Sequence, residues 1–128
     1  MEEKIKEVIN LTGHDINIVT NEGKLVKTFP TKGMVRIENR EVPKGELVEG
    51  VPNIDIEFSV PQWLPEKREG VVYIVSKIVC ERCKDRDDFY MVASSIRSKD
   101  GSKILGVKGL TKNPYFEELK KENENKSI

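Results

Sequence analysis

Apolar and polar residues alternate with a period of two along much of the chain, which is the spacing of a strand that buries one face. Clusters of turn-forming residues interrupt this alternation at short intervals, so the pattern predicts many short strands. The predicted strands cover residues 5–11, 16–18, 25–29, 34–37, 54–60, 71–75, 89–93 and 104–110. The segment 38–52 carries Pro43, Gly45, Gly50 and Pro52, and it is predicted to be a loop or an irregular edge.

Two of these segments have the clearest strand patterns. Ile54, Ile56, Phe58 and Val60 alternate strictly with polar residues, which predicts a strand with one face buried. Residues 71–75 are a continuous apolar run, which is typical of a strand buried on both faces.

The pattern changes to helical spacing at two places. Ser76 is a plausible N-cap for a short helix that runs through Lys84. Asn113 as N-cap, followed by Pro114 at the first helical position, predicts a second helix. The polar tail, residues 122–128, is expected to fray.

Seven or eight short strands and two short helices predict a mainly β (α+β) fold, either a small barrel or a sandwich whose open end the helices cover. The chain has 128 residues, and splitting it would leave pieces too small for good cores. We therefore expect one domain over residues 1–121, followed by the polar tail.

The composition narrows the classes of partner. The 22 basic and 22 acidic residues give a formal net charge of zero, which argues against a nucleic-acid partner. No apolar run approaches the roughly 20 residues that cross a bilayer. The acidic N-terminus does not resemble a signal peptide, so we expect a cytoplasmic protein with Cys80 and Cys83 as free thiols.

The residues offer no convincing catalytic or metal site. A structural zinc ion needs four ligands, and only His14 could join Cys80 and Cys83, which we interpret as small core side chains. Ser76, His14 and an aspartate could form a hydrolytic triad on paper, but Ser76 lacks the Gly-x-Ser-x-Gly context, and helix capping explains it equally well. We expect no metal and no cofactor, and a hydrolase is the third hypothesis.

Four short motifs carry a family resemblance over residues 8–110. They are Asn10-Leu11-Thr12-Gly13-His14, the Pro30 to Arg36 turn, the strand end Val72-Tyr73-Ile74-Val75-Ser76, and Arg86-Asp87-Asp88 followed by Arg97. In this order they resemble a group of small uncharacterised prokaryotic and phage proteins that open with an Asn-Leu-Thr-Pro-His-x-Ile type segment. Gly13 replaces the proline of that motif, and the helix after Asn113 lies outside the resemblance.

The resemblance implies a set of polar positions rather than an activity. They are His14, Arg36, Ser76, Arg86, Asp87 and Arg97. Polar residues shared at turns and strand ends need either a ligand or a buried hydrogen-bond network, and the sequence leaves both explanations open.

The leading functional hypothesis is a non-enzymatic domain that binds an anionic, nucleotide-like small ligand, because arginines form forked hydrogen bonds with such groups. We expect His14, Ser76 and at least one of Arg86 and Arg97 to share a pocket. This requires the first strand and the strand at 71–75 to be parallel neighbours or to meet at one end of a barrel.

The alternative is a structural or assembly module that binds a protein partner or forms a homo-oligomer. Under this hypothesis the polar set holds loops together. The interaction surface would be an uncovered strand edge in segment 38–52 or the face near Trp63, which is expected to fold over one end of the core.

Overall fold

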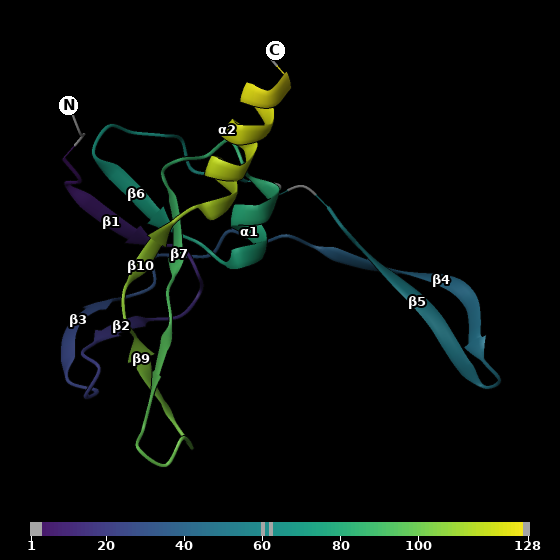
Figure 1. Ribbon diagram of the computed structural model, residues 1–128, viewed down its shortest axis with the longest axis horizontal. Helices are drawn as coiled ribbons and strands as arrows, with labels where there is room; N and C mark the ends of the chain where they lie inside the picture. Colours follow the sequence, from purple (N-terminus) through teal and green to yellow (C-terminus); the bar gives the residue numbers. More distant parts are fainter. Residues whose placement is uncertain (1–3, 60, 62, 127–128) are drawn as a thin grey trace.

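Ten strands and two helices make up the described part of the chain, which comprises residues 4–59, 61 and 63–126 of a computed structural model (Figure 1). In chain order they are β1 (Glu7–Asn10), β2 (Ile16–Val19), β3 (Leu25–Phe29), β4 (Asn39–Val48), β5 (Val51–Phe58), β6 (Val71–Ile74), α1 (Lys77–Arg82), β7 (Phe89–Val92), β8 (Ser95–Arg97), β9 (Ile104–Val107), β10 (Leu110–Lys112) and α2 (Pro114–Lys126).

The strands form three open sheets with the orders β1-β6-β7-β10, β3-β2-β9-β8 and β4-β5. In the first sheet β6 lies between β1 and β7 and is parallel to both, whereas β10 is antiparallel to β7. The predicted mainly β, α+β class is confirmed. The sheets do not close into a barrel, and a sandwich-like arrangement describes them better.

Two long, bent strands connect the first two sheets. The chain passes from β7 into β8 and returns from β9 into β10, and hydrogen bonds continue across the bend from Ala93 N to Gly109 O and from Lys108 N to Ser94 O, both 2.8 Å. The predicted strand 104–110 is therefore divided in two. Gly106 lies where β9 passes β2, and a Cβ there would be 2.6 Å from the Asn17 carbonyl oxygen, so only glycine allows this close approach.

The core lies between the first sheet and α1. Ile74, Val79 and Phe89 have no exposed surface, and the rings of Tyr73 and Phe89 meet edge to face with centroids 6.2 Å apart. The prediction that residues 71–75 form a strand buried on both faces is confirmed, since its neighbours cover both of its edges and the core covers its side chains.

Both predicted helices are present. Ser76 occupies the N-cap position of α1 in an extended conformation, although its side chain makes no capping hydrogen bond, and the helix ends at Arg82 rather than Lys84. Asn113 caps α2 as predicted, because its Oδ1 accepts a hydrogen bond of 3.0 Å from Tyr115 N. The helix continues to Lys126, so much of the predicted frayed tail is helical; residues 127–128 lie outside the described part.

Three predictions about strands need correction in whole or in part. Segment 34–37 is not a strand: Met34 makes only an isolated bridge with Thr12. For segment 38–52 the loop alternative is wrong and the irregular edge is confirmed, because most of it is the edge strand β4, whose pairing with β5 shifts register. The predicted strand at 54–60 exists as part of β5, but neither of its faces is covered, and Ile54 and Ile56 are 45% and 55% exposed. Val60 lies outside the described residues.

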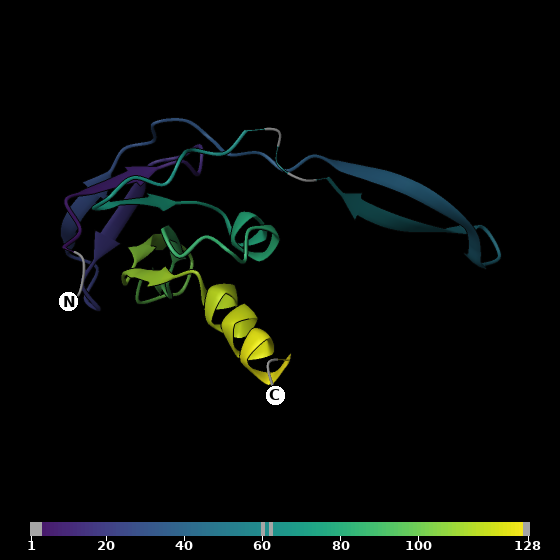
Figure 2. The same cartoon turned by 90° about the horizontal axis from the view of Figure 1, so that it is seen from above.

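The β4–β5 hairpin projects from the rest of the molecule (Figures 1 and 2). We call residues 39–58 the arm and the rest of the chain the body. Ten residues of strand correspond to a reach of about 30 Å at the usual rise per residue. No helix in the described ranges is both long and apolar enough to cross a membrane.

Candidate interaction surface

One face of the arm is apolar and open to solvent. Cross-strand pairs place Pro43 opposite Ile54, Glu41 opposite Ile56 and Asn39 opposite Phe58, and residues that face each other directly lie on the same side of a hairpin. The three apolar side chains of β5 therefore form a stripe along one side. The other side carries the Arg40–Glu57 ion pair of 2.6 Å, with Val42 opposite Asp55 next to it.

The tip of the arm carries further exposed apolar side chains. Leu47, Val48 and Val51 are 68%, 61% and 45% exposed around a turn in which Gly50 takes a left-handed conformation (φ 77°). Within the described residues, β4 and β5 pair only with each other. A lone two-stranded hairpin is marginally stable in water, so an apolar arm of this length gains most from a surface that covers it.

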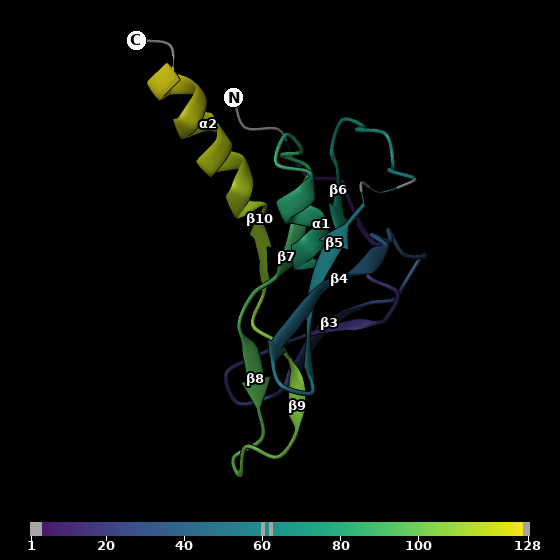
Figure 3. The ribbon, with the colours of Figure 1, turned by 90° about the vertical axis from the view of Figure 1, so that its right-hand side faces the viewer.

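The root of the arm is held against the body. Ser59 N donates a hydrogen bond of 2.9 Å to Glu38 O, which closes the base of the hairpin. The guanidinium of Arg82 on α1 lies 5.3 Å from the centre of the Phe58 ring, within cation–π range. The view from the arm side shows the hairpin in front of α1 and the first sheet (Figure 3).

The arm is acidic and the body is basic. Residues 39–58 contain two basic and five acidic residues, so the remainder of the chain holds 20 basic and 17 acidic ones. The zero net charge of the whole chain therefore conceals a separation of charge between its two parts.

Two of the predicted site residues meet at the arm root. Arg36 and Ser76 line a pocket of about 470 Å³ formed by segment 34–39 and the start of α1. The parallel pairing expected of the first strand and the strand at 71–75 is confirmed, with Asn10 opposite Ile74. His14 and Ser76 therefore both follow the carboxyl ends of neighbouring parallel strands, and His14 is exposed in its turn.

Arg86 belongs to a structural network. Its Nε and Nη2 each donate a hydrogen bond of 2.8 Å to the buried carboxylate of Asp88, and Nη2 donates another to Pro65 O. The guanidinium also lies 4.3 Å from the centre of the Phe89 ring. These contacts connect Pro65 to the loop before β7. They form a buried hydrogen-bond network, which is one of the two explanations that the sequence left open for Arg86.

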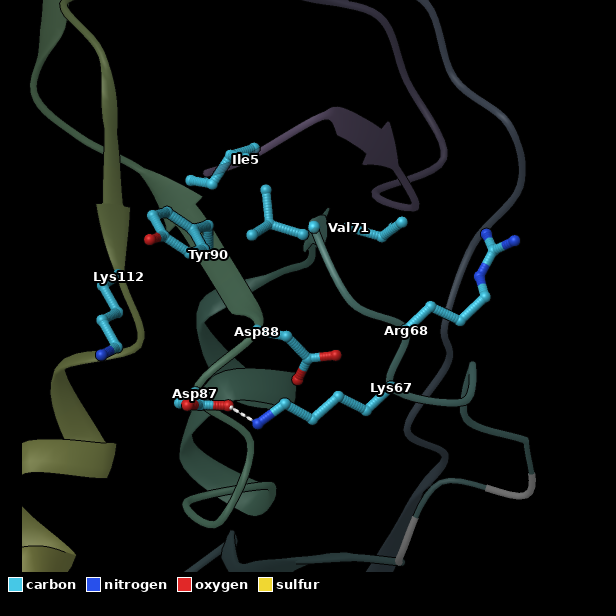
Figure 4. A pocket seen from close by; sticks show the side chains of 10 residues that line it. Ile5, Lys67, Arg68, Val71, Asp87, Asp88, Tyr90 and Lys112 are labelled. Carbon is cyan, nitrogen blue, oxygen red and sulfur yellow. Dashed lines mark hydrogen bonds and ion pairs between the residues drawn. The ribbon is translucent and has the colours of Figure 1, made fainter. Parts of the chain in front are cut away.

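Asp87 lies beside a different pocket, of about 530 Å³, between segment 67–72 and β7 (Figure 4). Lys67 points toward Asp87 and donates a hydrogen bond to its carboxylate, which lowers the pKa of Asp87. Lys112 lies 5.2 Å from the centre of the Phe116 ring. The lining mixes cations with the carboxylates of Asp87 and Asp88, so it offers an anion little excess positive charge.

Arg97 lies in the other sheet. It is exposed on β8, and its Nη1 donates a hydrogen bond of 3.2 Å to Gly101 O in the following turn. The structure thus brings Arg36 and Ser76 together, and it engages Arg86, Asp87 and Arg97 in contacts of their own. A ligand for any of these residues stays a prediction.

The two cysteines are core side chains, as interpreted from the sequence. Both thiols are buried among the apolar residues around α1 and are free. Burial, with the neighbouring Cys83 as a further cause, raises the pKa of Cys80 to about 12, which disfavours the reactive thiolate.

The sequence predicted Asn113 only as an N-cap and Asn10 only as part of a motif, and it did not predict that both are buried and bind distant carbonyl groups. The Asn10 amide donates to His14 O and Phe29 O, both at 2.8 Å, and its Oδ1 accepts from Thr12. The Asn113 amide donates to the carbonyl oxygens of Cys80, Cys83 and Arg86. For Asn10, the Asn-Leu-Thr motif was the available signal.

Trp63 does not fold over the core as the sequence predicted. Its side chain is 56% exposed, whereas Leu64 packs against the core and Pro65 is buried. The segment therefore covers the core with its second and third residues and leaves the tryptophan outside.

Comparison of the chain with family models, with curated proteins and with solved structures gave no significant match.

Proposed function

We propose that this protein is an assembly module that binds a protein partner through its arm. The observation that supports the proposal is the apolar stripe of Ile54, Ile56 and Phe58, in which Ile54 and Ile56 are 45% and 55% exposed and are covered by no described part of the chain. Contiguous exposed apolar surface with a polar rim is typical of a protein interface.

The shape of the arm favours a macromolecule over a small ligand. A small ligand binds in a concave pocket that surrounds it, whereas the arm is a projecting, convex element of about 30 Å. A hairpin with two open edges can also add its backbone to a neighbouring sheet.

A small anionic ligand is the second candidate, at the root pocket of Arg36 and Ser76. What favours it is the proximity of one arginine and one hydroxyl beside a pocket of about 470 Å³. It receives less support than the arm, because Arg86 and Asp87, which the same hypothesis needs, already have intramolecular partners.

A site-specific photo-cross-linker tests the proposed function in the cells that make the protein. A benzophenone side chain at Ile54 should form adducts with a discrete protein, whether a different protein or a second copy of this chain. The same group at Ile5, which is similarly exposed at 47% but lies on the body, is the matched control. Adduct formation at position 54 that does not exceed the level at position 5 would overturn the proposal.

A further inference from the structure

Resting on the proposed function, we infer that the partner of the arm is a second copy of this chain, and that the arm docks on the sheet β3-β2-β9-β8. We call this sheet, with the turn at 98–103, the basic end of the body. The inference comes from a match of charge and apolar surface between two parts of the same molecule that do not meet within one copy.

The basic end has the charge that complements the arm. Residues 16–19, 25–29 and 95–107 together contain four basic residues and one acidic residue, and Lys24 and Lys108 flank them. The arm contains two basic and five acidic residues. Opposite charges on two surfaces steer their encounter and select against wrong partners.

The basic end also carries uncovered apolar side chains. Leu25 and Val26 on β3 are 58% and 64% exposed, and Ile104 and Leu105 on β9 are 58% and 37% exposed. β3 and β8 are the edge strands of their sheet, so their outer backbone groups are available for strand addition. Each strand thus offers an exposed apolar side chain on either face of the sheet, beside the basic residues of this end.

The arm points away from the basic end of its own molecule, so the two surfaces do not meet within one copy. Figure 1 shows the arm leaving the body on the side of α1, whereas β3 lies at the opposite side of the body. The two matching surfaces can therefore meet only between copies.

The size of the arm points to reciprocal exchange. A two-stranded face of about 30 Å by about 10 Å covers about 300 Å², whereas a stable interface buries about 800 Å² on each partner. A two-fold dimer in which each copy gives its arm and receives the other arm doubles the contact to about 600 Å² on each copy, which is at the lower end of specific interfaces. Such isologous dimers are the commonest oligomers.

Light scattering coupled to gel filtration tests the inference on the purified full chain. The unaltered protein should have the mass of a dimer. The arm variant I54T/I56T keeps residues that favour strands but removes apolar contact. It should weaken dimerisation by about tenfold for each side chain, the effect of losing about 1.4 kcal/mol. The body variant K27E/K103E, which reverses two charges of the basic end, should also be monomeric.

Mixing the two variants gives the specific readout. The arm of K27E/K103E and the basic end of I54T/I56T are both intact, so the mixture keeps one of the two reciprocal contacts. It should associate at concentrations where each variant alone is monomeric, and more weakly than the unaltered chain. Ile5→Thr is the matched control and should dimerise like the unaltered chain, and thermal unfolding should show that all variants are folded.

Two results would overturn the inference. One is a monomeric mass for the unaltered chain at every concentration reached, and the other is a dimer that I54T/I56T leaves intact. If position 54 still cross-links to a different protein in cells, the proposed assembly function stands and only the identity of the partner is wrong. If position 54 gives no specific adduct either, the proposed function fails as well.

Discussion

Single polar side chains hold the loops of the body in place by binding distant backbone carbonyl groups. Arg86 reaches Pro65 O, and the Asn113 amide reaches three carbonyl oxygens at the end of α1 and in the loop that follows it. The sequence indicated that Arg86 has a specific role, but it could not show whether the residue binds a ligand or belongs to an internal hydrogen-bond network. The deciding acceptors are backbone atoms, which leave no pattern in the side chains.

Asn113 should be among the most sensitive residues of the body. Replacing Asn113 by Ala removes the donor to buried carbonyl groups and the cap of α2, and should lower the free energy of unfolding by about 2–4 kcal/mol. Asn113→Asp should cost at least as much, because a carboxylate would face three carbonyl oxygens.

Urea unfolding measures both variants, with Asn21→Ala in an exposed turn as the control. The control should change the stability by less than about 0.5 kcal/mol. An N113A protein as stable as the unaltered chain would show that the amide does not hold these loops.

Among the secondary-structure elements, those with purely local signals were predictable. The apolar run 71–75 predicted β6, and the pair Asn113-Pro114 predicted the start of α2. β4 was missed because Pro43 and Gly45 are typical of loops. In the structure both are accommodated, since β4 is an edge strand and its register shifts between Pro43 and Glu46.

The alternation in β5 predicted a strand correctly and burial wrongly. A period of two shows that one face of a strand is apolar, but it does not show what covers that face. Ile54 and Ile56 have no covering surface in the described part of their own chain, and the function that we propose assigns that cover to a partner.

The body should fold without the arm. Replacing residues 40–57 by an Asn-Gly turn keeps the facing pair Asn39 and Phe58, the hydrogen bond from Ser59 to Glu38, and the contact of Phe58 with Arg82. The shortened chain should differ in stability by no more than about 0.5 kcal/mol, as for other surface changes.

Thermal or urea unfolding at low protein concentration, where association adds nothing, gives this comparison. A large loss of stability would mean that the arm supports the body in the monomer. That result would argue that the exposed stripe serves folding rather than docking.

At the scale of the whole molecule, the free energy of unfolding should depend on pH through the ionisation of the buried Cys80 thiol. The pKa of Cys80 is about 12 in the folded protein and about 8.5 in an unfolded chain. Because the folded pKa is the higher one, the contribution of Cys80 is complete below about pH 8.5, and it is lost as the pH rises from there toward 12.

We therefore expect the free energy of unfolding to fall above about pH 8.5, and to fall less steeply in Cys80→Ser, which has no thiol to ionise at that position. The measurement is urea unfolding at intervals between pH 7 and 10, and the comparison is of slopes rather than absolute stabilities. Equal slopes in the two proteins would show that Cys80 ionises equally in the folded and unfolded states.

The candidate surface was only partly predictable at this scale. The proximity of Arg36 and Ser76 depends on which strands are neighbours, and the sequence could state it only as a condition. The charge separation was hidden because the net charge of the whole chain is zero. It becomes visible only when the boundary between arm and body is known.

The meeting of the arm's two ends at Glu38 and Ser59 has a consequence for how such a protein can evolve. The arm lies in the long connection between the paired strands β1 and β6. The entropy of closing that connection grows only with the logarithm of its length, so gaining or losing a hairpin of this size changes it by about 0.3 kcal/mol. Insertions, deletions and substitutions in the arm should therefore change folding very little. If the arm binds a partner as we propose, selection on them acts through binding, and a lineage could change its partner without rebuilding its core.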